Sequence, residues 1–259
     1  MSEKNQGKLQ GKHAVVTGGG RGIGAAIADA LAAEGANVTL LGRNMDVLKA
    51  KAETLPQATP LACDVTDRAA VEAVFAEARE NYGSVDILVN NAGAAHPAPF
   101  MKTSPDDLQA MLDVNLKGPW HCIQAVLPDM LEKDSGRIIN IASTAALIGY
   151  KYVTAYSAAK HAVQGMTRSL ALELANKGVT VNSVCPGFTE TDIAFDAIDN
   201  IMSKTGRSRE QAIAELAKHN PQKRFIQPEE VASAVLWLCE DVNRSMTGQA
   251  ISVAGGEVM

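Results

Sequence analysis

The chain has 259 residues, of which 46% are hydrophobic, and it carries a formal net charge of −5 at pH 7. This length allows one sizeable hydrophobic core, which α/β proteins of this size often build as a single domain. The charges form no long basic run, which argues against nucleic-acid binding, and no apolar stretch approaches the ~20 residues of a membrane span. The polar beginning of the chain lacks a signal-peptide pattern, so we expect a cytoplasmic protein without nucleic-acid or membrane partners.

Apolar runs of strand length alternate along the chain with stretches of helical periodicity. In chain order we predict a strand at 12–17, a helix at 23–34, a strand at 37–41, a helix at 44–54, a strand at 59–63, a helix at 68–82, a strand at 85–89, a helix at 104–130, a strand at 137–141, a helix at 155–176, a strand at 179–184, a helix from 228 and a strand at 249–253. This alternation is typical of right-handed βαβ crossovers, which place helices on both faces of a parallel sheet. We therefore predict a single α/β domain over residues 1–259, a doubly wound Rossmann fold with a seven-stranded parallel sheet.

One segment, 188–225, interrupts this alternation with a polar, partly helical insertion between the last two strands. Loops at the carboxyl ends of strands hold the ligand in doubly wound sheets, so we interpret this insertion as a substrate lid. Its cations either attract an anionic group of a substrate, such as a carboxylate or a coenzyme-A phosphate, or lie on solvated helix faces. They are Lys204, Arg207, Arg209, Lys218, Lys223 and Arg224.

The first predicted strand runs into a glycine-rich loop, TGGGRGIG at 17–24, which opens the first predicted helix. Glycines permit a tight turn with positive φ and let the backbone approach a pyrophosphate at a helix N-terminus. A strand before such a loop and a helix after it are the context in which the motif predicts dinucleotide binding. The spacing Gly18-x-x-x-Gly22-x-Gly24 fits this context better than a GxGxxA register drawn from Gly20.

The end of the second predicted strand bears on the choice between NAD and NADP. An acidic residue there binds the ribose 2′-hydroxyl of NAD, whereas an arginine accommodates the 2′-phosphate of NADP. Here Gly42 stands in the place of the acid, Arg43 follows it, and Arg21 in the glycine loop adds a second cation. The pattern favours NADP(H). The alternative, in which Arg43 is a solvated residue at a helix start, leaves NAD open.

A hydroxyl and a tyrosine–lysine pair follow the fifth predicted strand. Ser143 lies directly after this strand, and Tyr156 and Lys160 are four residues apart on the next helix, which puts them on one face. A phenol with an ordinary pKa near ~10 is a poor acid–base catalyst at neutral pH. A neighbouring ammonium favours the tyrosinate, so we expect Lys160 to lower the pKa of Tyr156.

Taken together, five motifs in this order are similar to those of the short-chain dehydrogenase/reductase family, over nearly the whole chain from 12 to 256. They are Thr17-Gly18-x-x-x-Gly22-x-Gly24, Asn90-Asn91-Ala92-Gly93, Asn115, Ser143 and Tyr156-x-x-x-Lys160, accompanied by Pro186-Gly187 and Thr191 after the sixth strand.

The resemblance implies a catalytic role for four residues. Tyr156 would be the general acid in reduction and the base in oxidation, and Ser143 would orient the substrate oxygen. Lys160 would bind the nicotinamide ribose and lower the pKa of the tyrosine. Asn115 would hold a water that links Lys160 to a proton relay.

The same resemblance implies a cofactor cleft and a homotetramer built on the long helices at 104–130 and 155–176. Asp64 and Val65 would meet the adenine, and Thr189 and Thr191 would contact the nicotinamide carboxamide. The full set of expected cofactor-binding residues is Gly18, Arg21, Gly22, Ile23, Gly24, Arg43, Asp64, Val65, Asn91, Ala92, Gly93, Tyr156, Lys160, Pro186, Gly187, Thr189 and Thr191.

Three hypotheses for function follow. The leading one is an NADP(H)-dependent ketone reductase or alcohol dehydrogenase. The second is an NAD-dependent dehydrogenase of a 3-hydroxy acid or 3-hydroxyacyl thioester, since residues 217–256 resemble 3-hydroxybutyrate dehydrogenases and 3-oxoacyl reductases. The third is a non-catalytic cofactor-sensing protein, which we would expect to have lost Ser143, Tyr156 or Lys160, and all three are present.

Some other residues carry simpler expectations. Tyr150 and Tyr152 flank the expected mouth of the site and either shape the pocket or lie outside it, and Trp237 is expected in the core. The four cysteines are widely separated and form no CxxC pair, so we expect buried, reduced thiols. No spacing of His, Cys and acidic residues indicates a catalytic metal.

Overall fold

The computed structural model describes residues 7–259, apart from the side chain of Ile193. The predicted unit starts at residue 1, and residues 1–6 lie outside the described residues. Seven parallel strands form one sheet in the order β3-β2-β1-β4-β5-β6-β7. The strands are β1 (His13–Thr17), β2 (Asn37–Gly42), β3 (Ala58–Ala62), β4 (Ile87–Asn90), β5 (Gly136–Ile141), β6 (Val179–Pro186) and β7 (Ala250–Val253). The predicted seven-stranded Rossmann fold is confirmed.

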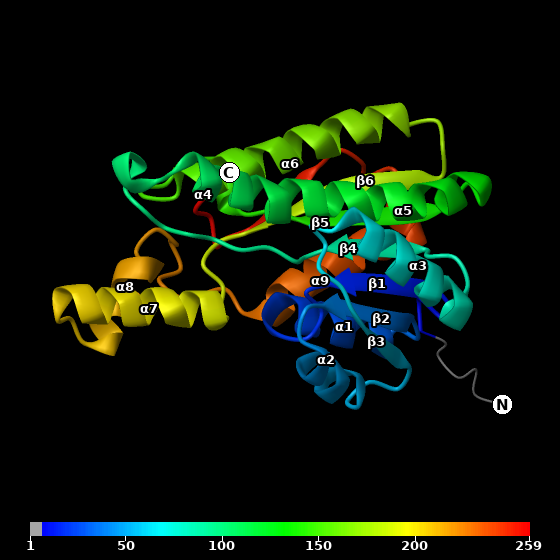
Figure 1. Cartoon of the computed structure of the whole chain (residues 1–259), viewed down its shortest axis with the longest axis horizontal. Coiled ribbons are helices and arrows are strands. Elements are labelled where there is room, and N and C mark those ends of the chain that lie inside the picture. The colour runs from blue at the N-terminus through cyan, green and yellow to red at the C-terminus, as the bar shows by residue number, and fades with distance from the viewer. Residues whose placement is uncertain (1–6) are drawn as a thin grey trace.

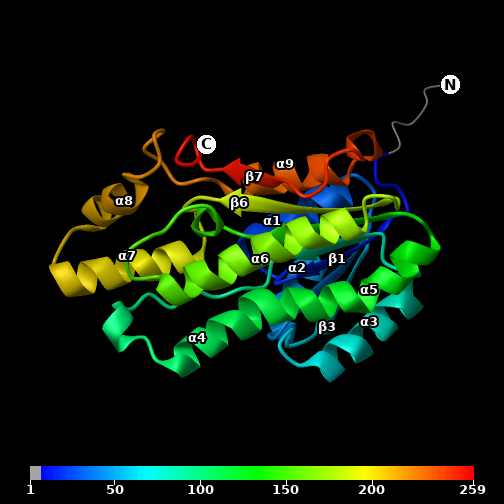
Figure 2. The ribbon, with the colours of Figure 1, turned by 90° about the horizontal axis from the view of Figure 1, so that it is seen from above.

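Helices cover both faces of the sheet (Figures 1 and 2). The α-helices are α1 (Gly22–Ala33), α2 (Met45–Ala52), α3 (Arg68–Tyr82), α4 (Pro105–Leu112), α5 (Gly118–Glu132), α6 (Thr154–Glu173), α7 (Asp192–Thr205), α8 (Arg209–Ala217) and α9 (Pro228–Cys239). One buried apolar cluster joins the sheet to α1, α2 and α9, and a second joins it to α3, α5 and α6. The core strands β1, β4, β5 and β6 are buried along their whole length, as expected of a sheet covered on both sides.

Short polar side chains fix where several helices begin. Asn44 and Asp67 each accept two backbone N–H groups at the start of α2 and α3. Ser104 forms a capping box with Asp107 ahead of α4, in which Pro105 occupies the first turn. These caps explain why the predicted helix starts lie within one or two residues of those observed.

The predicted helix at 104–130 is divided in the structure. It consists of α4 and α5 joined by a π-helical turn over Asp113–Lys117, which carries Asn115. A π-helical turn contains one extra residue but leaves the apolar spacing within each flanking helix unchanged. Hydrophobic periodicity alone therefore does not reveal the turn.

The expectation that Trp237 lies in the core is wrong, because its side chain is 41% exposed. The buried face of α9 carries Val235, Leu238 and Cys239, at helical spacing. Trp237 falls between these positions and therefore faces outward.

A buried polar ladder sets the rotation of α6 over the sheet. The side-chain amide of Asn90 on β4 donates to Asn140 on β5 (2.9 Å), which donates in turn to the hydroxyl of Thr167 on α6 (2.9 Å). Ser183 on β6 donates to the same hydroxyl (3.0 Å). Thr167 is seven residues, two helical turns, after Lys160, so the ladder also directs the Lys160 face of α6 towards the ends of the strands.

The segment predicted as a lid forms two helices, α7 and α8, which stand away from the sheet at its carboxyl edge (Figure 1, yellow and orange). They bury a small apolar cluster of their own, centred on Ile198 and Phe225. None of the described helices has the length and apolar character needed to cross a membrane.

Candidate active site

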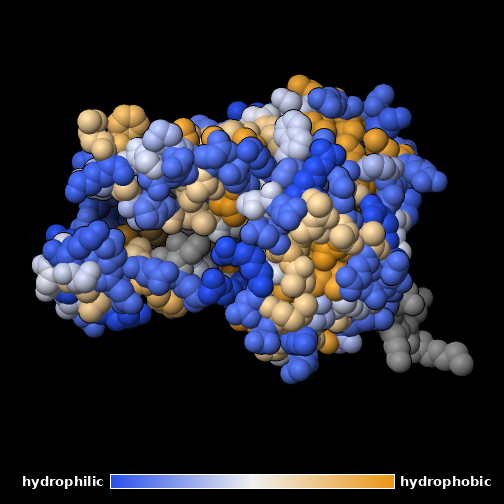
Figure 3. All heavy atoms as spheres, in the orientation of Figure 1, coloured by the Kyte–Doolittle hydropathy of each residue, from blue (hydrophilic) through white to orange (hydrophobic). Residues whose placement is uncertain are grey.

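The sequence motifs meet at the carboxyl edge of the sheet, where a hollow opens in the molecular surface between α7–α8 and the main body (Figure 3). The glycine loop follows β1, Asn91 to Gly93 follow β4, Ser143 follows β5 and Gly187 follows β6. In a doubly wound sheet this edge, on both sides of the point where the strand order reverses, is where ligands bind. Here β1 and β4 are neighbours at that point.

The glycine loop has the backbone conformation that its sequence predicts. Gly18 and Gly22 have φ of +64° and +52°, a region that favours glycine, and these two positions support the Gly18-x-x-x-Gly22-x-Gly24 register. A Cβ on Gly24 would lie 2.2 Å from the carbonyl oxygen of Gly18, so only glycine fits there.

The N-terminus of α1, which this loop opens, is left available to a ligand. Its N-cap Arg21 makes no side-chain cap hydrogen bond, unlike the caps of α2, α3 and α4, and its first turn holds no acidic residue, unlike those of α2 and α4. The unpaired N–H groups and positive dipole end of such a helix suit a pyrophosphate. The local structure therefore fits a dinucleotide at the place that the sequence predicted.

The loop after β4 braces the glycine loop. The hydroxyl of Thr17 accepts the backbone N–H groups of Asn91 and Ala92, both at 3.0 Å, and the Asn91 amide donates to the carbonyls of Thr17 and Gly18. These bonds fix the backbone on the two sides of the cleft relative to one another.

The partly buried Ser143 and Tyr156 come together with the buried Lys160. The hydroxyls of Ser143 and Tyr156 share a hydrogen bond, and the Nζ of Lys160 lies 5.6 Å from the centre of the Tyr156 ring. Lys160 is 5% exposed, and its Nζ donates to the carbonyl oxygen of Ile141 at the end of β5 (2.9 Å). This bond ties the face of α6 that carries Tyr156 and Lys160 to the strand that ends beside Ser143.

The electrostatics of the cluster differ from the sequence-based expectation. Burial raises the pKa of Tyr156 above its ordinary value, and the hydrogen bond from Ser143 opposes this rise only in part. Burial also lowers the pKa of Lys160 to about 8. Desolvation therefore outweighs the effect that we expected of Lys160 on the phenol, and Tyr156 is protonated at neutral pH.

Asn115 lies beside this cluster, on the π-helical turn. Its amide donates to the carbonyls of Ala94 (2.9 Å) and Met111 (3.0 Å), and the side chain is 1% exposed. A Cβ on Gly93 would lie 2.8 Å from Oδ1 of Asn115 and 3.6 Å from Nζ of Lys160. The absence of a side chain at Gly93 thus lets Asn115 and Lys160 approach the same point.

The residues expected at the adenosine end lie at the ends of β2 and β3. Two hydrogen bonds from Thr66, one from its backbone and one from its hydroxyl, lower the pKa of Asp64, with a smaller contribution from the charge of Arg43. Arg43 is exposed at the start of α2, and Val65 is buried with its carbonyl against the His121 ring (3.1 Å). Arg43 and Asp64 are therefore near enough to face a common ligand.

Arg21 is directed elsewhere. Its guanidinium pairs with Asp192, the first residue of α7, at 2.9 Å, and both side chains are largely exposed at 75% and 57%. Thr191 packs towards Gly22 in the same region, where its Cγ2 lies 3.2 Å from the position of a Cβ on that glycine. The start of α7 thus contacts the glycine loop across the cleft.

Two tyrosines near the mouth have different environments. Tyr152 is 62% exposed, whereas the half-buried Tyr150 donates from its hydroxyl to Glu257 (2.7 Å). Glu257 follows β7 and had no signal in the sequence, because it belongs to none of the motifs and is distant from them along the chain.

Cys185 was missed for the same reason. Its thiol accepts the Ser143 N–H, and burial raises its pKa to about 11.

The cations of α7 and α8 pair mainly with carboxylates of their own segment. Glu215 accepts from both Arg207 and Lys218, and Asp199 pairs with Arg209. Arg224 forms two hydrogen bonds with Glu230 at the start of α9. These contacts favour the solvated-surface interpretation over an anion-binding lid.

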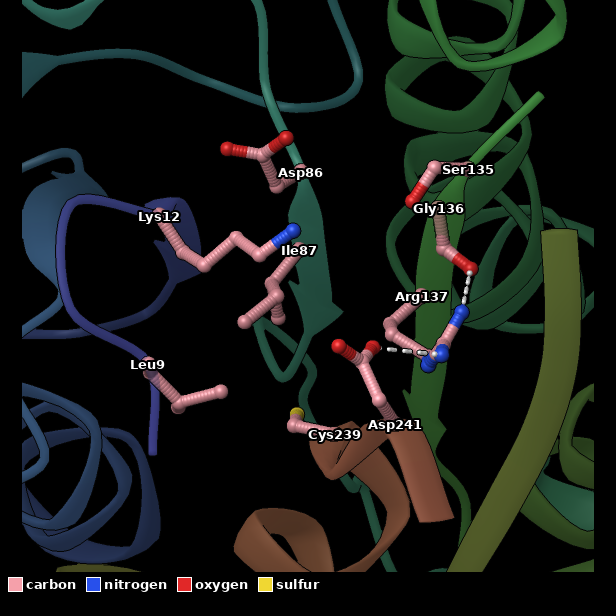
Figure 4. Close-up of a pocket in the computed structure, with 9 residues that line it drawn as sticks. All are labelled: Leu9, Lys12, Asp86, Ile87, Ser135, Gly136, Arg137, Cys239 and Asp241. Carbon is pink, nitrogen blue, oxygen red and sulfur yellow. Dashed lines mark hydrogen bonds and ion pairs between the residues drawn. The ribbon is translucent and has the colours of Figure 1, made fainter. Parts of the chain in front are cut away.

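A separate small cavity lies at the opposite, amino edge of the sheet (Figure 4). Lys12 and Arg137 extend towards it, and Arg137 donates to the Gly136 carbonyl (2.9 Å) and to Asp241 (3.0 Å). Its volume of about 10 Å³ is room for about one water molecule. It is too small and too distant from the catalytic cluster to be part of the active site.

The described residues contain no group of three or more His, Cys, Asp or Glu side chains placed to hold a metal ion. All four cysteines are buried and unbridged, as expected.

The burial of Lys160 gives a prediction for stability. Because its folded pKa of about 8 lies below the ordinary 10.5, the unfolded chain binds more protons between these pH values, and the free energy of unfolding rises with pH there. We expect Lys160→Met to be more stable than wild type at pH 7, by up to about 3 kcal/mol, and the difference to shrink between pH 8 and 10.5. Urea unfolding across this pH range measures it, with the exposed Lys177→Met as control. A difference independent of pH would contradict the charge-burial argument.

The comparisons with known proteins agree with this geometry. A family model described as enoyl-(acyl carrier protein) reductase matches residues 18–257. The chain is 37% identical to the D-beta-hydroxybutyrate dehydrogenase of Cupriavidus necator, covering 96% of this chain and 99% of that protein. It is also 37% identical to the 3-oxoacyl-[acyl-carrier-protein] reductase FabG of Thermotoga maritima, covering 97% and 100%.

A solved structure extends the likeness to three dimensions. The crystal structure of a variant of actinorhodin polyketide ketoreductase with NADPH has a TM-score of 0.92 and 37% identity, and covers 95% of this chain and 97% of that one. Matches over nearly the whole length, in sequence and in fold, leave one assignment: the chain belongs to the short-chain dehydrogenase/reductase family of oxidoreductases.

Proposed function

We propose that the protein is an NADP(H)-dependent reductase of ketones, which oxidises the corresponding secondary alcohols in the reverse direction. The observation that carries the proposal is the cluster of Ser143, Tyr156 and the buried Lys160 at the same edge of the sheet as the uncapped N-terminus of α1. A 3-oxoacyl reductase, a hydroxybutyrate dehydrogenase and an NADPH-bound ketoreductase among its relatives support a keto or hydroxyl substrate.

The cofactor, when bound, supplies or accepts the hydride, and the residues of this chain handle the proton. The pKa of Tyr156 is raised by burial, so its phenol is protonated at neutral pH, the state that a general acid needs in carbonyl reduction. Ser143 interacts with the same hydroxyl, and when a substrate is bound its single O–H can turn to donate to the substrate oxygen instead. The two groups together orient the carbonyl and protonate it as negative charge develops.

Lys160 and Asn115 complete the proposed proton path. Lys160 reaches into the cluster from one turn beyond Tyr156, and Gly93 leaves space between it and Asn115. Because the Asn115 amide is bonded to the Ala94 and Met111 carbonyls, its oxygen is held in a fixed direction towards this space. A water between Asn115 and Lys160 would return the proton to Tyr156.

The proposed preference for NADP(H) rests on Arg43. It is exposed at the start of α2, beside Asp64, and Gly42 leaves no acidic side chain at the end of β2 to repel a 2′-phosphate. Arg21 supplies a second cation once it leaves Asp192. The remaining sequence-predicted cofactor residues keep their proposed roles, including Ile23, Pro186, Gly187, Thr189 and Thr191.

We also propose a cytoplasmic homotetramer. The helices α4, α5 and α6 expose large apolar side chains, among them Leu108, Trp120 and Leu172, which a subunit interface would bury. Four unbridged, buried thiols suit a reducing compartment.

A second candidate is an NAD-dependent dehydrogenase of a 3-hydroxy acid or 3-hydroxyacyl thioester, which the D-beta-hydroxybutyrate dehydrogenase relative favours. A screen of simple ketones, 3-oxoacyl thioesters and 3-hydroxy acids with both coenzymes decides between the candidates. Absence of hydride transfer with every substrate would contradict both and favour a cofactor-sensing protein.

Tyr156→Phe should remove the proton donor while the fold and the cleft persist. We expect kcat for ketone reduction to fall by about 10²–10⁴-fold, the usual contribution of general acid–base catalysis, with NADPH affinity by fluorescence titration within about threefold of wild type. Tyr152→Phe, at the exposed neighbour, is the matched control and should retain full turnover. A Tyr156→Phe variant with near-normal kcat would contradict the mechanism.

Arg43→Asp should invert the coenzyme preference, because it replaces a cation near the 2′-phosphate by an acid that can accept the ribose hydroxyls of NAD. We expect kcat/KM to fall at least about tenfold with NADPH and to rise with NADH, where tenfold corresponds to about 1.4 kcal/mol. Lys49→Asp, an exposed residue further along α2, controls for the change in net charge. Equal changes with both coenzymes would show that Arg43 does not bind the phosphate.

Asp192→Asn should release Arg21 for the same phosphate. Exposed ion pairs contribute about 1 kcal/mol or less, so we expect a KM for NADPH lower by about two- to fivefold and an unchanged KM for NADH. Steady-state kinetics with each coenzyme measure this. A parallel fall in both KM values would instead indicate a general effect of α7 on cleft opening.

A further inference from the structure

A half-buried carboxylate lies close to Gly187, at the carboxyl edge of the sheet where the site motifs meet. Glu257 lies on the segment that follows β7, which passes beside the end of β6 on the side of α8 (Figure 2). Its Oε1 accepts the hydrogen bond of the Tyr150 hydroxyl at 2.7 Å, and both residues are half-buried. No motif of the sequence and no step of the proposed mechanism uses this pair.

Two contacts connect the pair to the catalytic cluster. The Tyr150 hydroxyl also lies close to the side chain of Thr144, the residue that follows Ser143. Oε2 of Glu257 lies 3.1 Å from where a Cβ of Gly187 would stand, and Gly187 is two residues beyond Cys185, whose thiol accepts the Ser143 N–H. Glu257 is therefore anchored from β5 and from β6, within two residues of the Ser143 contacts on each side.

The surroundings offer an anionic substrate little compensation. Four cations of segment 188–225 are paired with carboxylates: Arg207 and Lys218 with Glu215, Arg209 with Asp199, and Arg224 with Glu230. Lys223 donates to the Lys218 carbonyl, Lys204 is exposed near the end of α7, and the Lys160 ammonium donates to the Ile141 carbonyl. His219, the remaining basic side chain in contact with the pair, packs edge-on against the Tyr150 ring with ring centres 6.2 Å apart. A carboxylate on the substrate would thus meet a fixed carboxylate of the protein in a partly desolvated cleft.

We infer that the carboxylate of Glu257 determines the substrate class: it selects ketones whose flanking groups are uncharged, such as 3-oxo esters and thioesters, and rejects free 3-oxo acids. The inference rests on the proposed function and sharpens it, because it separates two kinds of substrate that share the same reacting carbonyl. Like charges placed across a binding site are an effective means of rejecting the wrong ligand.

The test compares acetoacetate with methyl acetoacetate, which have the same ketone and differ in charge at pH 7. In wild type we expect kcat/KM for the ester to exceed that for the acid by at least tenfold. In Glu257→Gln, which keeps the size of the side chain and removes the charge, the ratio of acid to ester should rise by at least tenfold. The quantity measured is NADPH oxidation at saturating coenzyme.

Two further variants separate charge from shape. Tyr150→Phe keeps the carboxylate and should keep the wild-type ratio within about threefold. Glu173→Gln, at an exposed position near the far end of α6, changes the net charge equally and should leave the ratio as in wild type. An unchanged ratio in Glu257→Gln, or an equal rise in Tyr150→Phe, overturns the inference while the proposed ketone reduction stands. If wild type reduces neither compound nor any other ketone, it is the proposed function that fails.

Discussion

The hydrogen bond from the buried Lys160 ammonium to the Ile141 carbonyl is the interaction on which the arrangement of the site depends. A lysine with no ion-pair partner among the described residues is costly to bury, and its lowered pKa reflects that cost. The buried position of Lys160 is maintained because α6 is also fixed two turns further along, where the Thr167 hydroxyl accepts hydrogen bonds from Asn140 and Ser183. With both ends of this face fixed, Tyr156 has little freedom except to meet Ser143. The burial of Lys160 thus lowers the stability of the fold but defines the geometry of Lys160, Tyr156 and Ser143. Such a trade-off between stability and function is common at active sites.

Much of this could be predicted from sequence, because the decisive relations are local or follow from the topology. Tyr156 and Lys160 share a helix face by their spacing alone, and the residues that follow β1, β4, β5 and β6 must meet at one edge once the sheet is parallel. The observed helix starts at α3 and α4 coincide with the caps Asp67 and Ser104. Two features that the local sequence pattern does not encode were not predicted. They are the π-helical turn around Asn115, which preserves the periodicity of the flanking helices, and the outward rotation of Trp237. The pKa of Tyr156 was expected to fall, and it rises, since pairwise charge was considered without desolvation.

On the cofactor side of the cleft, too, some features can be predicted from the sequence and others cannot. The glycine loop is specified by its own residues, since positive φ at Gly18 and Gly22 and the close approach at Gly24 each require glycine. The partner of Arg21 is not specified in this way. Asp192 lies 171 residues further along the chain, at the start of α7, and reaches Arg21 only because the segment after β6 crosses the cleft. A side chain that is assigned to a ligand from its motif can therefore have a protein partner of its own, and the ligand must compete with it.

The substrate side is built differently from the catalytic side, and this difference explains where specificity resides. Ser143 stands after the end of β5 and Tyr156 and Lys160 stand on α6, so the sheet dictates their places. Glu257 and Tyr150 stand on connecting segments, the one after β7 and the other before α6, and contact each other there. Such positions can change without disturbing the core, which is why loops on a rigid scaffold carry recognition. A single carboxylate there can exclude acids from a site whose reacting groups act on the ketone whether or not the substrate carries an acid. The reaction therefore follows from the fold, whereas the choice of substrate follows from a pair of residues on connecting segments.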